Sequence, residues 1–352
     1  MARICPDKVP TVPSSILQFV VSAGIGIVPV LVFVAALVVL DSYKLVRLRG
    51  VLLTVVIGCL GALITYIVNH QLRELLALGD DPFRRFVAPV GEEILKATYV
   101  IYLVNTKKVG FTVDAVIYGF AIGAGFAVVE NSYYMHALPH ATPYTWFVRG
   151  FGTAVMHGGT TAIVAIFAKS FSDRTRPAQT GTIFLGLLLA IITHSGYNHF
   201  FFHPLLSAVG ISIALPVLFV FIFERSREAT RTWLGIGFDT DVELLKLITS
   251  GNVASTKIGQ YLETLRNRFR GEIIADMLCY LRIHLELAVQ AKGLLLMREA
   301  GFEIPRDPEV EAKFKELNHL HKTIGTTGYL TLKPILHRSD RELWQLHMLG
   351  QQ

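Results

Sequence analysis

The chain has 352 residues, of which 52% are hydrophobic and only 17% are charged. Soluble domains carry about 25% charged residues, so this composition excludes an ordinary soluble globule, a disordered chain and a coiled coil. The net charge of +6 does not indicate a nucleic-acid partner. The basic residues of the chain are divided between short loops and a tail of mixed charge, which is the distribution found in membrane proteins.

Long, almost uncharged apolar segments fill the first 224 residues. A helix that crosses the hydrocarbon core of a bilayer needs about 20 apolar residues, and only helices or closed barrels satisfy their backbone groups at that depth. The sequence therefore predicts an all-α, polytopic membrane protein with about seven transmembrane helices. In chain order, the predicted spans cover residues 16–40, 51–68, 86–104, 111–134, 144–168, 181–200 and 205–223.

The C-terminal part of the chain has a different composition. Residues 225–352 hold 18 Lys and Arg and 16 Asp and Glu, against 15 and 11 in the longer segment 1–224. Apolar residues recur at helical spacing between 271 and 300. We therefore expect a transmembrane domain at 1–224 and a small helical cytoplasmic domain at 225–352. Packing of these apolar residues within the C-terminal domain is the simplest explanation of the tail, and docking of a cytoplasmic partner is the alternative.

The charges of the loops predict the orientation in the membrane. If the N-terminus lies outside, the cytoplasmic loops and the start of the tail carry eleven basic residues, and the opposite side carries five. Lys and Arg are enriched in cytoplasmic loops. The expected arrangement is therefore an outer N-terminus and a cytoplasmic C-terminus.

Ionisable residues inside the predicted spans are the candidates for function, because such side chains are expensive in a membrane. A rise of 1.5 Å per residue places Glu92, Glu130 and His194 roughly 6–10 Å from the outer ends of their spans, with His157 deeper. We predict that these side chains converge in one cluster. Each alone has a plainer explanation, such as an interfacial salt bridge or a hydrogen bond between helices, but the shared depth favours function.

Helical spacing adds further residues to this cluster. Lys96 is placed to pair with one of two adjacent carboxylates, and Asn198 follows His194 on the same helix face. The predicted site residues are Glu92, Glu93, Glu130, His157, His194 and Asn198, with Lys96, Asn131 and Arg149 in supporting positions.

Four motifs follow one another on four consecutive spans: Glu92-Glu93-x-x-Lys96, Phe126-x-x-x-Glu130-Asn131, His157, and His194-x-x-x-Asn198. Over about residues 85–200, the motif core, this series resembles the PrsW family of intramembrane proteases. That family is related to the CAAX-processing and bacteriocin-immunity membrane proteases. The CAAX branch has EExxxR and FxxxH in the first two motifs, and EExxK and FxxxEN here point to the PrsW branch.

The resemblance implies an endopeptidase of the bacterial cytoplasmic (inner) membrane that cuts a membrane-anchored protein substrate in regulated proteolysis. By the resemblance, Glu92 is the expected general base, although Glu93 is an almost equal choice. A buried carboxylate can take up a proton from an attacking water. Glu130 would position that water, and His194 and Asn198 would stabilise the oxyanion. His157 would act as a second acid or as a ligand of the water.

Three alternatives remain open in the sequence, and one of them is a non-catalytic family member that acts as an adaptor through its C-terminal tail. No cofactor is predicted, but Glu92, Glu130, His157 and His194 are acceptable ligands for zinc or another divalent metal. The resemblance favours a metal-independent glutamate mechanism. A proton- or ion-coupled transporter would also bury Glu and His residues, although the spans show no repeated half, which many transporters have.

Overall fold

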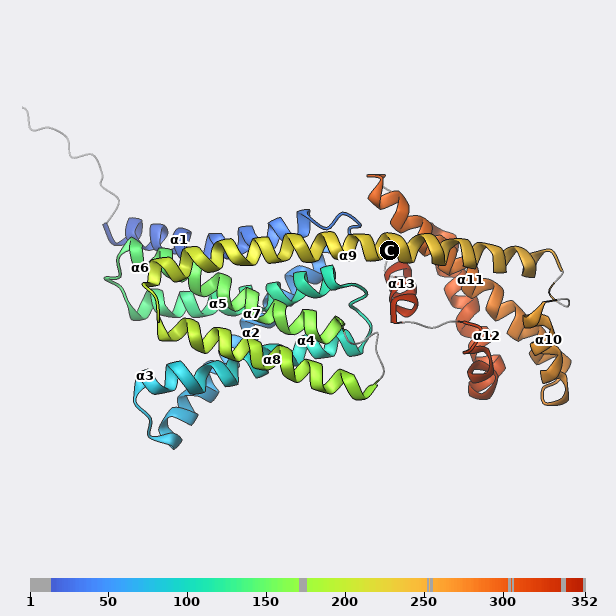
Figure 1. Cartoon of the computed structure of the whole chain (residues 1–352), viewed down its shortest axis with the longest axis horizontal. Coiled ribbons are helices and arrows are strands. Elements are labelled where there is room, and N and C mark those ends of the chain that lie inside the picture. The colour runs from blue at the N-terminus through green and yellow to red at the C-terminus, as the bar shows by residue number, and fades with distance from the viewer. Residues whose placement is uncertain are drawn as a thin grey trace, which may run out of the picture.

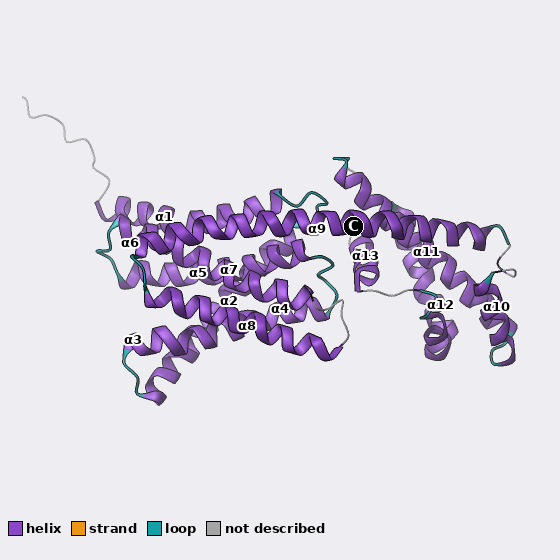
Figure 2. Cartoon of the chain, viewed as in Figure 1, coloured by secondary structure: helices purple, strands orange, loops and turns teal. Residues whose placement is uncertain are grey.

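The computed structural model describes residues 14–170, 176–251, 253, 256–302, 305, 307–336 and 340–350. Within these ranges the regular elements are helices and no strand occurs (Figure 1, Figure 2). Among the described residues, six helical stretches are long and apolar enough to cross a membrane, by length and composition. The predicted all-α, polytopic membrane fold is therefore confirmed.

The membrane bundle is formed by the helices α1 to α9 and by two π-helical turns. Its elements are α1 (Ser14–Val39), α2 (Leu48–Leu76), α3 (Asp80–Pro82), η1 (Phe83–Val87), α4 (Ala88–Asn105), α5 (Thr112–Ala137), α6 (Pro143–Phe147), η2 (Val148–Thr153), α7 (Ala154–Ser170), α8 (Arg176–His199) and the first half of α9 (Pro204–Thr249).

Helix α5 is the centre of this bundle and packs against α1, α2 and α7. Glycines allow the close approach. A Cβ atom at Gly119 would lie 2.9 Å from the Cα of Ala162, and one at Gly123 or Gly125 would collide with the carbonyl group of His157 or Val55. Small residues are what lets transmembrane helices approach so closely. The backbones of α5 and α7 therefore touch, which brings the polar residues of these two helices together.

The remaining spans surround this centre and carry the lipid-facing surface. In the most apolar windows of α1, α2, α8 and α9 only 17–28% of residues are buried, against 78% in α5 and in the stretch from α6 to α7. The exposed side chains of the outer helices are large and apolar, as Leu52, Phe184 and Phe221 illustrate. Such a surface suits hydrocarbon and would be unfavourable in water.

The third predicted span differs from expectation. Residues 86–104 form helix α4 inside the bundle, in contact with α2, α7 and α8, but α4 is not among the six stretches that meet the length and hydropathy of a span. The reason is its charge. Glu92, Glu93 and Lys96 lie on α4, and Glu93 and Lys96 are 0% and 2% exposed. A helix whose charges are turned inward can sit in a bundle without an apolar sequence.

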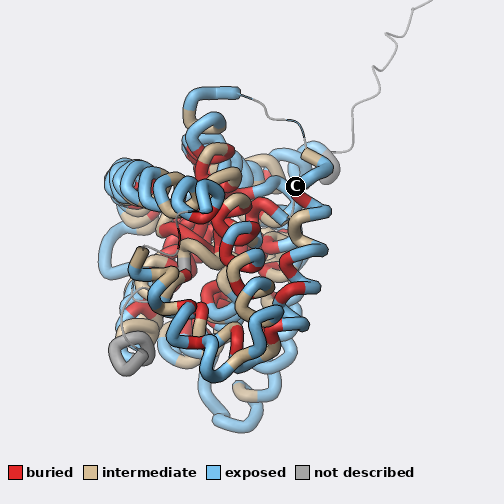
Figure 3. The backbone as a smooth tube through the Cα atoms, turned by 90° about the vertical axis from the view of Figure 1, so that its right-hand side faces the viewer, coloured by how far each residue is buried: buried red, intermediate tan, exposed pale blue. Residues whose placement is uncertain are grey.

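Helix α9 continues beyond the membrane bundle into the C-terminal helices (Figure 1). The predicted domain boundary at 224/225 falls within this helix. The C-terminal elements are α10 (Lys257–Thr264), η4 (Leu265–Asn267), α11 (Gly271–Glu299), α12 (Pro308–Leu332) and α13 (Asp340–Gly350). Their buried residues form a core around α11, and an end-on view shows the buried positions gathered along the axis of the molecule (Figure 3).

The C-terminal helices touch the start of α5. Phe111 precedes this helix. The centroid of its ring lies 5.2 Å from the ring centroid of Trp344 on α13 and 5.5 Å from that of Trp233 on α9. Asp114 accepts hydrogen bonds from the backbone N–H groups of Gly110 and Phe111 and so caps the helix. The position of α5 therefore depends on contacts from both parts of the chain.

Candidate functional site

Two π-helical turns stand directly before the helices that carry the predicted site. Turn η1 leads into α4 with Glu92 and Glu93, and turn η2 leads into α7 with His157. Such turns add one residue to the helical repeat and are frequent at functional sites.

Glu93 is the centre of a buried polar network. Its Oε1 atom accepts from Lys96 Nζ at 2.5 Å and from Thr160 Oγ1 at 3.2 Å, and it lies 2.8 Å from His194 Nδ1. The carboxylate of Glu93 is fully buried, so its charge is acceptable only because Lys96 offsets it and several donors surround it. Glu93 therefore joins α4, α7 and α8 and fixes the orientation of His194.

Glu130 holds a second network beside the first. Its two oxygens lie 3.0 Å from Arg149 Nη2 and 2.6 Å from His157 Nε2. Arg149 also donates to Asn131 Oδ1 at 2.9 Å, and the amide of Asn131 donates to the carbonyl oxygen of Gly26 at 2.7 Å. These contacts tie α5 to η2, α7 and α1.

The hydrogen-bond partners define the tautomers of both histidines. His157 Nδ1 lies 3.1 Å from the Lys96 ammonium, which can only donate, so Nδ1 accepts and Nε2–H donates to Glu130. His194 has the opposite arrangement, because its Nδ1–H faces the Glu93 carboxylate. In the neutral imidazole, His194 Nε2 then carries the lone pair, and this atom lies 3.8 Å from Glu92 Oε2.

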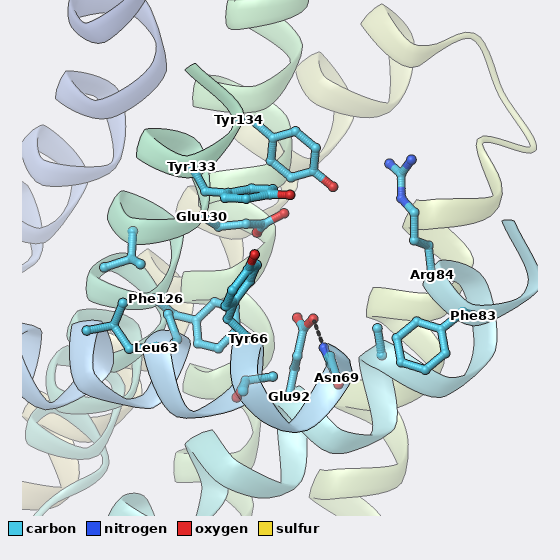
Figure 4. A pocket seen from close by; sticks show the side chains of 14 residues that line it. Leu63, Tyr66, Asn69, Phe83, Arg84, Glu92, Phe126, Glu130, Tyr133 and Tyr134 are labelled. Carbon is cyan, nitrogen blue, oxygen red and sulfur yellow. Dashed lines mark hydrogen bonds between the residues drawn. The ribbon is translucent and has the colours of Figure 1, made fainter. Parts of the chain in front are cut away.

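Glu92 differs from Glu93 because it faces a cavity. The cavity has a volume of about 390 Å³ and lies between α2, η1, α4 and α5, with Glu92 and Glu130 in its wall (Figure 4). Asn69 of α2 donates its amide to Glu92 Oε1 at 3.4 Å. Most of the remaining wall is apolar or aromatic: Ala62, Leu63, Tyr66, Phe83, Ala88, Phe126, Val129, Tyr133 and Tyr134.

The structure brings eight of the nine predicted residues into these connected networks, and the exception is Asn198. Its amide donates to the carbonyl oxygen of Arg84 at 3.0 Å, so it ties α8 to the π-helical turn η1. This contact directs one N–H of Asn198 away from the networks of Glu93 and Glu130, and the oxyanion role of Asn198 stays a prediction. Residues spaced i,i+4 share a face of a helix, but one turn of rise is enough to give Asn198 and His194 different partners.

Sequence reasoning missed Thr160 and Asn69. Thr160 lies one turn after His157 and donates to Glu93, so helical spacing from His157 could have indicated it. Asn69 lies one residue beyond the predicted end of the second span, whereas α2 continues to Leu76. A longer second span would have placed this amide inside the membrane and marked it as a candidate.

Three of the four predicted metal ligands offer donor atoms to one common point. The ligand atoms of Glu92, His157 and His194 all lie within 4.8 Å of one another. One carboxylate and two imidazoles suit zinc, and the Glu93 contact to His194 is the kind of outer partner that metal-binding histidines have. His157 would have to exchange one of its two contacts to bind a metal. Glu130 does not belong to this group and instead holds His157 and Arg149.

Comparison with known proteins gives a family match. A family model described as PrsW family intramembrane metalloprotease matches residues 47–223, which span from the start of α2 to the membrane half of α9 and include all nine predicted site residues. No curated protein matches the chain, and no solved structure does.

Proposed function

Because the chain belongs to the PrsW family of intramembrane metalloproteases, it is an integral membrane protease, and we propose that it cuts a membrane-anchored protein at the cavity in front of Glu92. Membership of this family favours the protease over the ion-coupled transporter that the sequence had left open. The observation that carries the proposal is the meeting of Glu92 Oε2 and His194 Nε2 at 3.8 Å, beside a cavity that Glu92 lines.

We assign the general base to Glu92. Two acceptor atoms 3.8 Å apart can both reach one water molecule at hydrogen-bond distance. Glu92 then takes the proton of that water as its oxygen attacks the peptide carbonyl, and returns the proton to the leaving amine. Glu93 is an unsuitable base because it is fully buried and engaged with Lys96 and His194.

The other residues position these groups. Glu93 holds His194 with its Nε2 lone pair toward Glu92, so in this tautomer His194 acts as an acceptor and not as an oxyanion donor. Glu130 and Arg149 hold His157, and Asn69 holds the Glu92 carboxylate from the other side. Preorganised groups of this kind lower the barrier because they need no rearrangement during the reaction.

The donor set supports a metal-dependent variant of the same hydrolysis. Glu92, His157 and His194 would hold a divalent ion such as zinc. The ion would supply Lewis-acid activation of water and carbonyl. In either variant Glu93 orients His194, and Glu130 and Lys96 set the contacts of His157.

One experiment tests both the activity and its chemistry. Wild-type protein and Glu92→Gln are expressed in matched membranes, and new N-termini of single-span proteins are quantified by mass spectrometry. We expect cleavage products from the wild type that are absent with Glu92→Gln. Metal analysis of the purified protein, with a chelator added to the cleavage assay, separates the variants. Products that persist with Glu92→Gln would exclude Glu92 as the base.

We further propose that the protein resides in a bacterial cytoplasmic membrane, with its N-terminus outside and residues 225–352 forming a cytoplasmic domain. The distribution of Lys and Arg supports this orientation. Cys279 on α11 is exposed and offers a native probe. A membrane-impermeant maleimide should label Cys279 in inverted vesicles and not in spheroplasts, and the opposite result would reverse the topology. Signalling through regulated proteolysis, and a cytoplasmic partner for this domain, are part of the same proposal.

A further inference from the structure

Arg84 places a positive charge at the edge of the cavity that contains Glu92. It lies on the π-helical turn η1, lines this cavity and has an exposed side chain. Its guanidinium carbon lies 6.0 Å from the centre of the Tyr134 ring on α5, and Figure 4 shows the guanidinium group on the side of the cavity opposite Tyr134. A chain bound in the cavity can therefore reach this group.

Arg84 has no carboxylate partner among the residues that the structure describes. The other described arginines at this end of the bundle have one at 2.6–3.9 Å, and the pairs are Arg73–Asp80, Arg85–Asp81 and Arg149–Glu130. Asp80 lies one helical turn before Arg84 and would be its ordinary partner, but it is bound to Arg73. The charge of Arg84 is therefore available to a group that the described chain does not supply.

The main chain around Arg84 is fixed by helix α8. The carbonyl oxygen of Arg84 accepts from Asn198 Nδ2 at 3.0 Å, and that of Arg85 accepts from Ser195 Oγ at 2.6 Å. Both donors are on the helix that carries His194. The guanidinium group therefore starts from a defined place relative to the proposed site, which lowers the entropy that is lost when it binds a ligand.

The carboxylates of the cavity wall restrict where a bound chain can carry negative charge. Glu92 and Glu130 both line the cavity, and like charges that share a site disfavour each other. An acidic side chain is therefore disfavoured beside Glu92 and favoured at Arg84. A guanidinium group holds a carboxylate through two parallel hydrogen bonds, so it distinguishes an acidic side chain from its neutral amide analogue.

We propose that Arg84 is a specificity-determining residue that binds an Asp or Glu side chain of the single-span substrate. This inference rests on the proposed function, because it assigns a second contact to the chain that Glu92 would cut. Phe83 and Phe126, which line the same cavity, would receive apolar side chains between the acidic residue and the scissile bond.

Helical geometry gives the expected position of the acidic residue. Glu130 marks the level of the proposed site, because it lies 2.6 Å from His157, and a ligand atom of His157 lies within 4.8 Å of one of Glu92. Tyr134 follows Glu130 by four residues, a rise of about 6 Å, which two residues of an extended chain cover at about 3.3 Å each. We therefore expect the Asp or Glu two or three residues from the scissile bond, on the side where α5 ends.

The test uses the purified full-length protein in liposomes of phosphatidylcholine, with synthetic single-span peptides that carry a fluorophore and a quencher. Each peptide has Asn throughout the segment on the outer side of the scissile bond, except for one Asp that moves through the set. Mass spectrometry of the products identifies the bond that is cut. With the wild type we expect kcat/KM to be about 5- to 20-fold higher for one position of Asp than for the peptide without Asp.

Substitution in the protein assigns this preference to Arg84. Arg84→Gln should remove it, so that the Asp and Asn peptides have equal kcat/KM, and Arg84→Glu should favour a peptide with Lys at the same position. Arg85→Gln is the matched control, because Arg85 lies on the same turn and does not line the cavity. This control should keep the wild-type preference. Melting temperatures show whether each variant is folded.

The outcomes separate this inference from the proposed function. If the wild type cuts the peptides, Glu92→Gln does not, and the wild type prefers no position of Asp, then only the role of Arg84 is overturned. A preference that survives in Arg84→Gln overturns it as well. So does a loss that is equal for all peptides and grows with added phosphatidylglycerol, because Arg84 then binds lipid phosphate. If the wild type and Glu92→Gln are equally inactive or equally active, both proposals fail.

Discussion

Replacement of Lys96 by Met tests whether charge compensation holds the centre of the bundle. The ammonium group of Lys96 lies 2.5 Å from Glu93 Oε1, 3.1 Å from His157 Nδ1 and 4.8 Å from the ring of Phe126. The side chains of Lys96 and Glu93 are 1% and 0% exposed. A methionine fills a similar volume but leaves the Glu93 carboxylate without its cation. Loss of one partner of a buried ion pair costs about 3–5 kcal/mol.

The double variant Lys96→Met/Glu93→Leu separates stability from activity. Replacing both partners of a buried pair by apolar residues is often neutral or stabilising, so the double variant should recover most of the stability. It should remain inactive, because His194 has lost the carboxylate that holds its Nδ1–H. Recovery of stability without recovery of cleavage is therefore the expected pattern.

The assay is thermal unfolding of the purified variants in detergent, together with cleavage in liposomes. Lys315→Met is the control, because the Lys315–Glu311 pair is exposed and such pairs contribute about 0.3–0.5 kcal/mol. If Lys96→Met unfolds at the wild-type temperature, or if the double variant is less stable than Lys96→Met, the proposed role of the ion pair is wrong.

Three further predictions concern packing, an individual residue and pH. Gly123→Ala places a methyl group against the carbonyl of His157 and should lower the free energy of unfolding by at least about 1–3 kcal/mol. Gly210→Ala is the control, because its methyl group meets open space and should not destabilise the protein in the same unfolding assay. Asn198→Ala should retain activity within about 10-fold of the wild type in the cleavage assay, because its amide binds the backbone. A complete loss of activity would support the catalytic role that the sequence predicts for Asn198. Burial raises the pKa of Asp41, in the loop between α1 and α2, from 3.8 to about 6, against the opposing effect of backbone hydrogen bonds. Folding therefore disfavours the ionised form of Asp41. The free energy of unfolding should be highest below pH 4 and should fall by about 3 kcal/mol as the pH rises to 6. Unfolding temperatures of Asp41→Asn should lack this dependence between pH 4 and pH 6.

The amino-acid sequence is sufficient for the fold class and for the main candidates of the site. Apolar runs long enough to cross a bilayer can form only helices or barrels at that depth. The described residues contain six such helices, one fewer than the seven spans that the sequence predicts. Charges inside those runs are too costly to be accidental, so Glu92, Glu130, His157 and His194 stand out by their position in the chain. Their common depth follows from helical rise alone.

The partners of these side chains depend on how the helices pack. Glu92 and Glu93 are neighbours in sequence and are almost equal candidates there, yet one lines a cavity and the other is enclosed by Lys96 and His194. The difference depends on which neighbouring helix each side chain of α4 faces, and the packing of α4 against α2, α7 and α8 decides this. The roles of Asn69 and Thr160 are hidden in the sequence for the same reason, because a polar residue on a helix gains such hydrogen-bond partners only from the helices that pack against it.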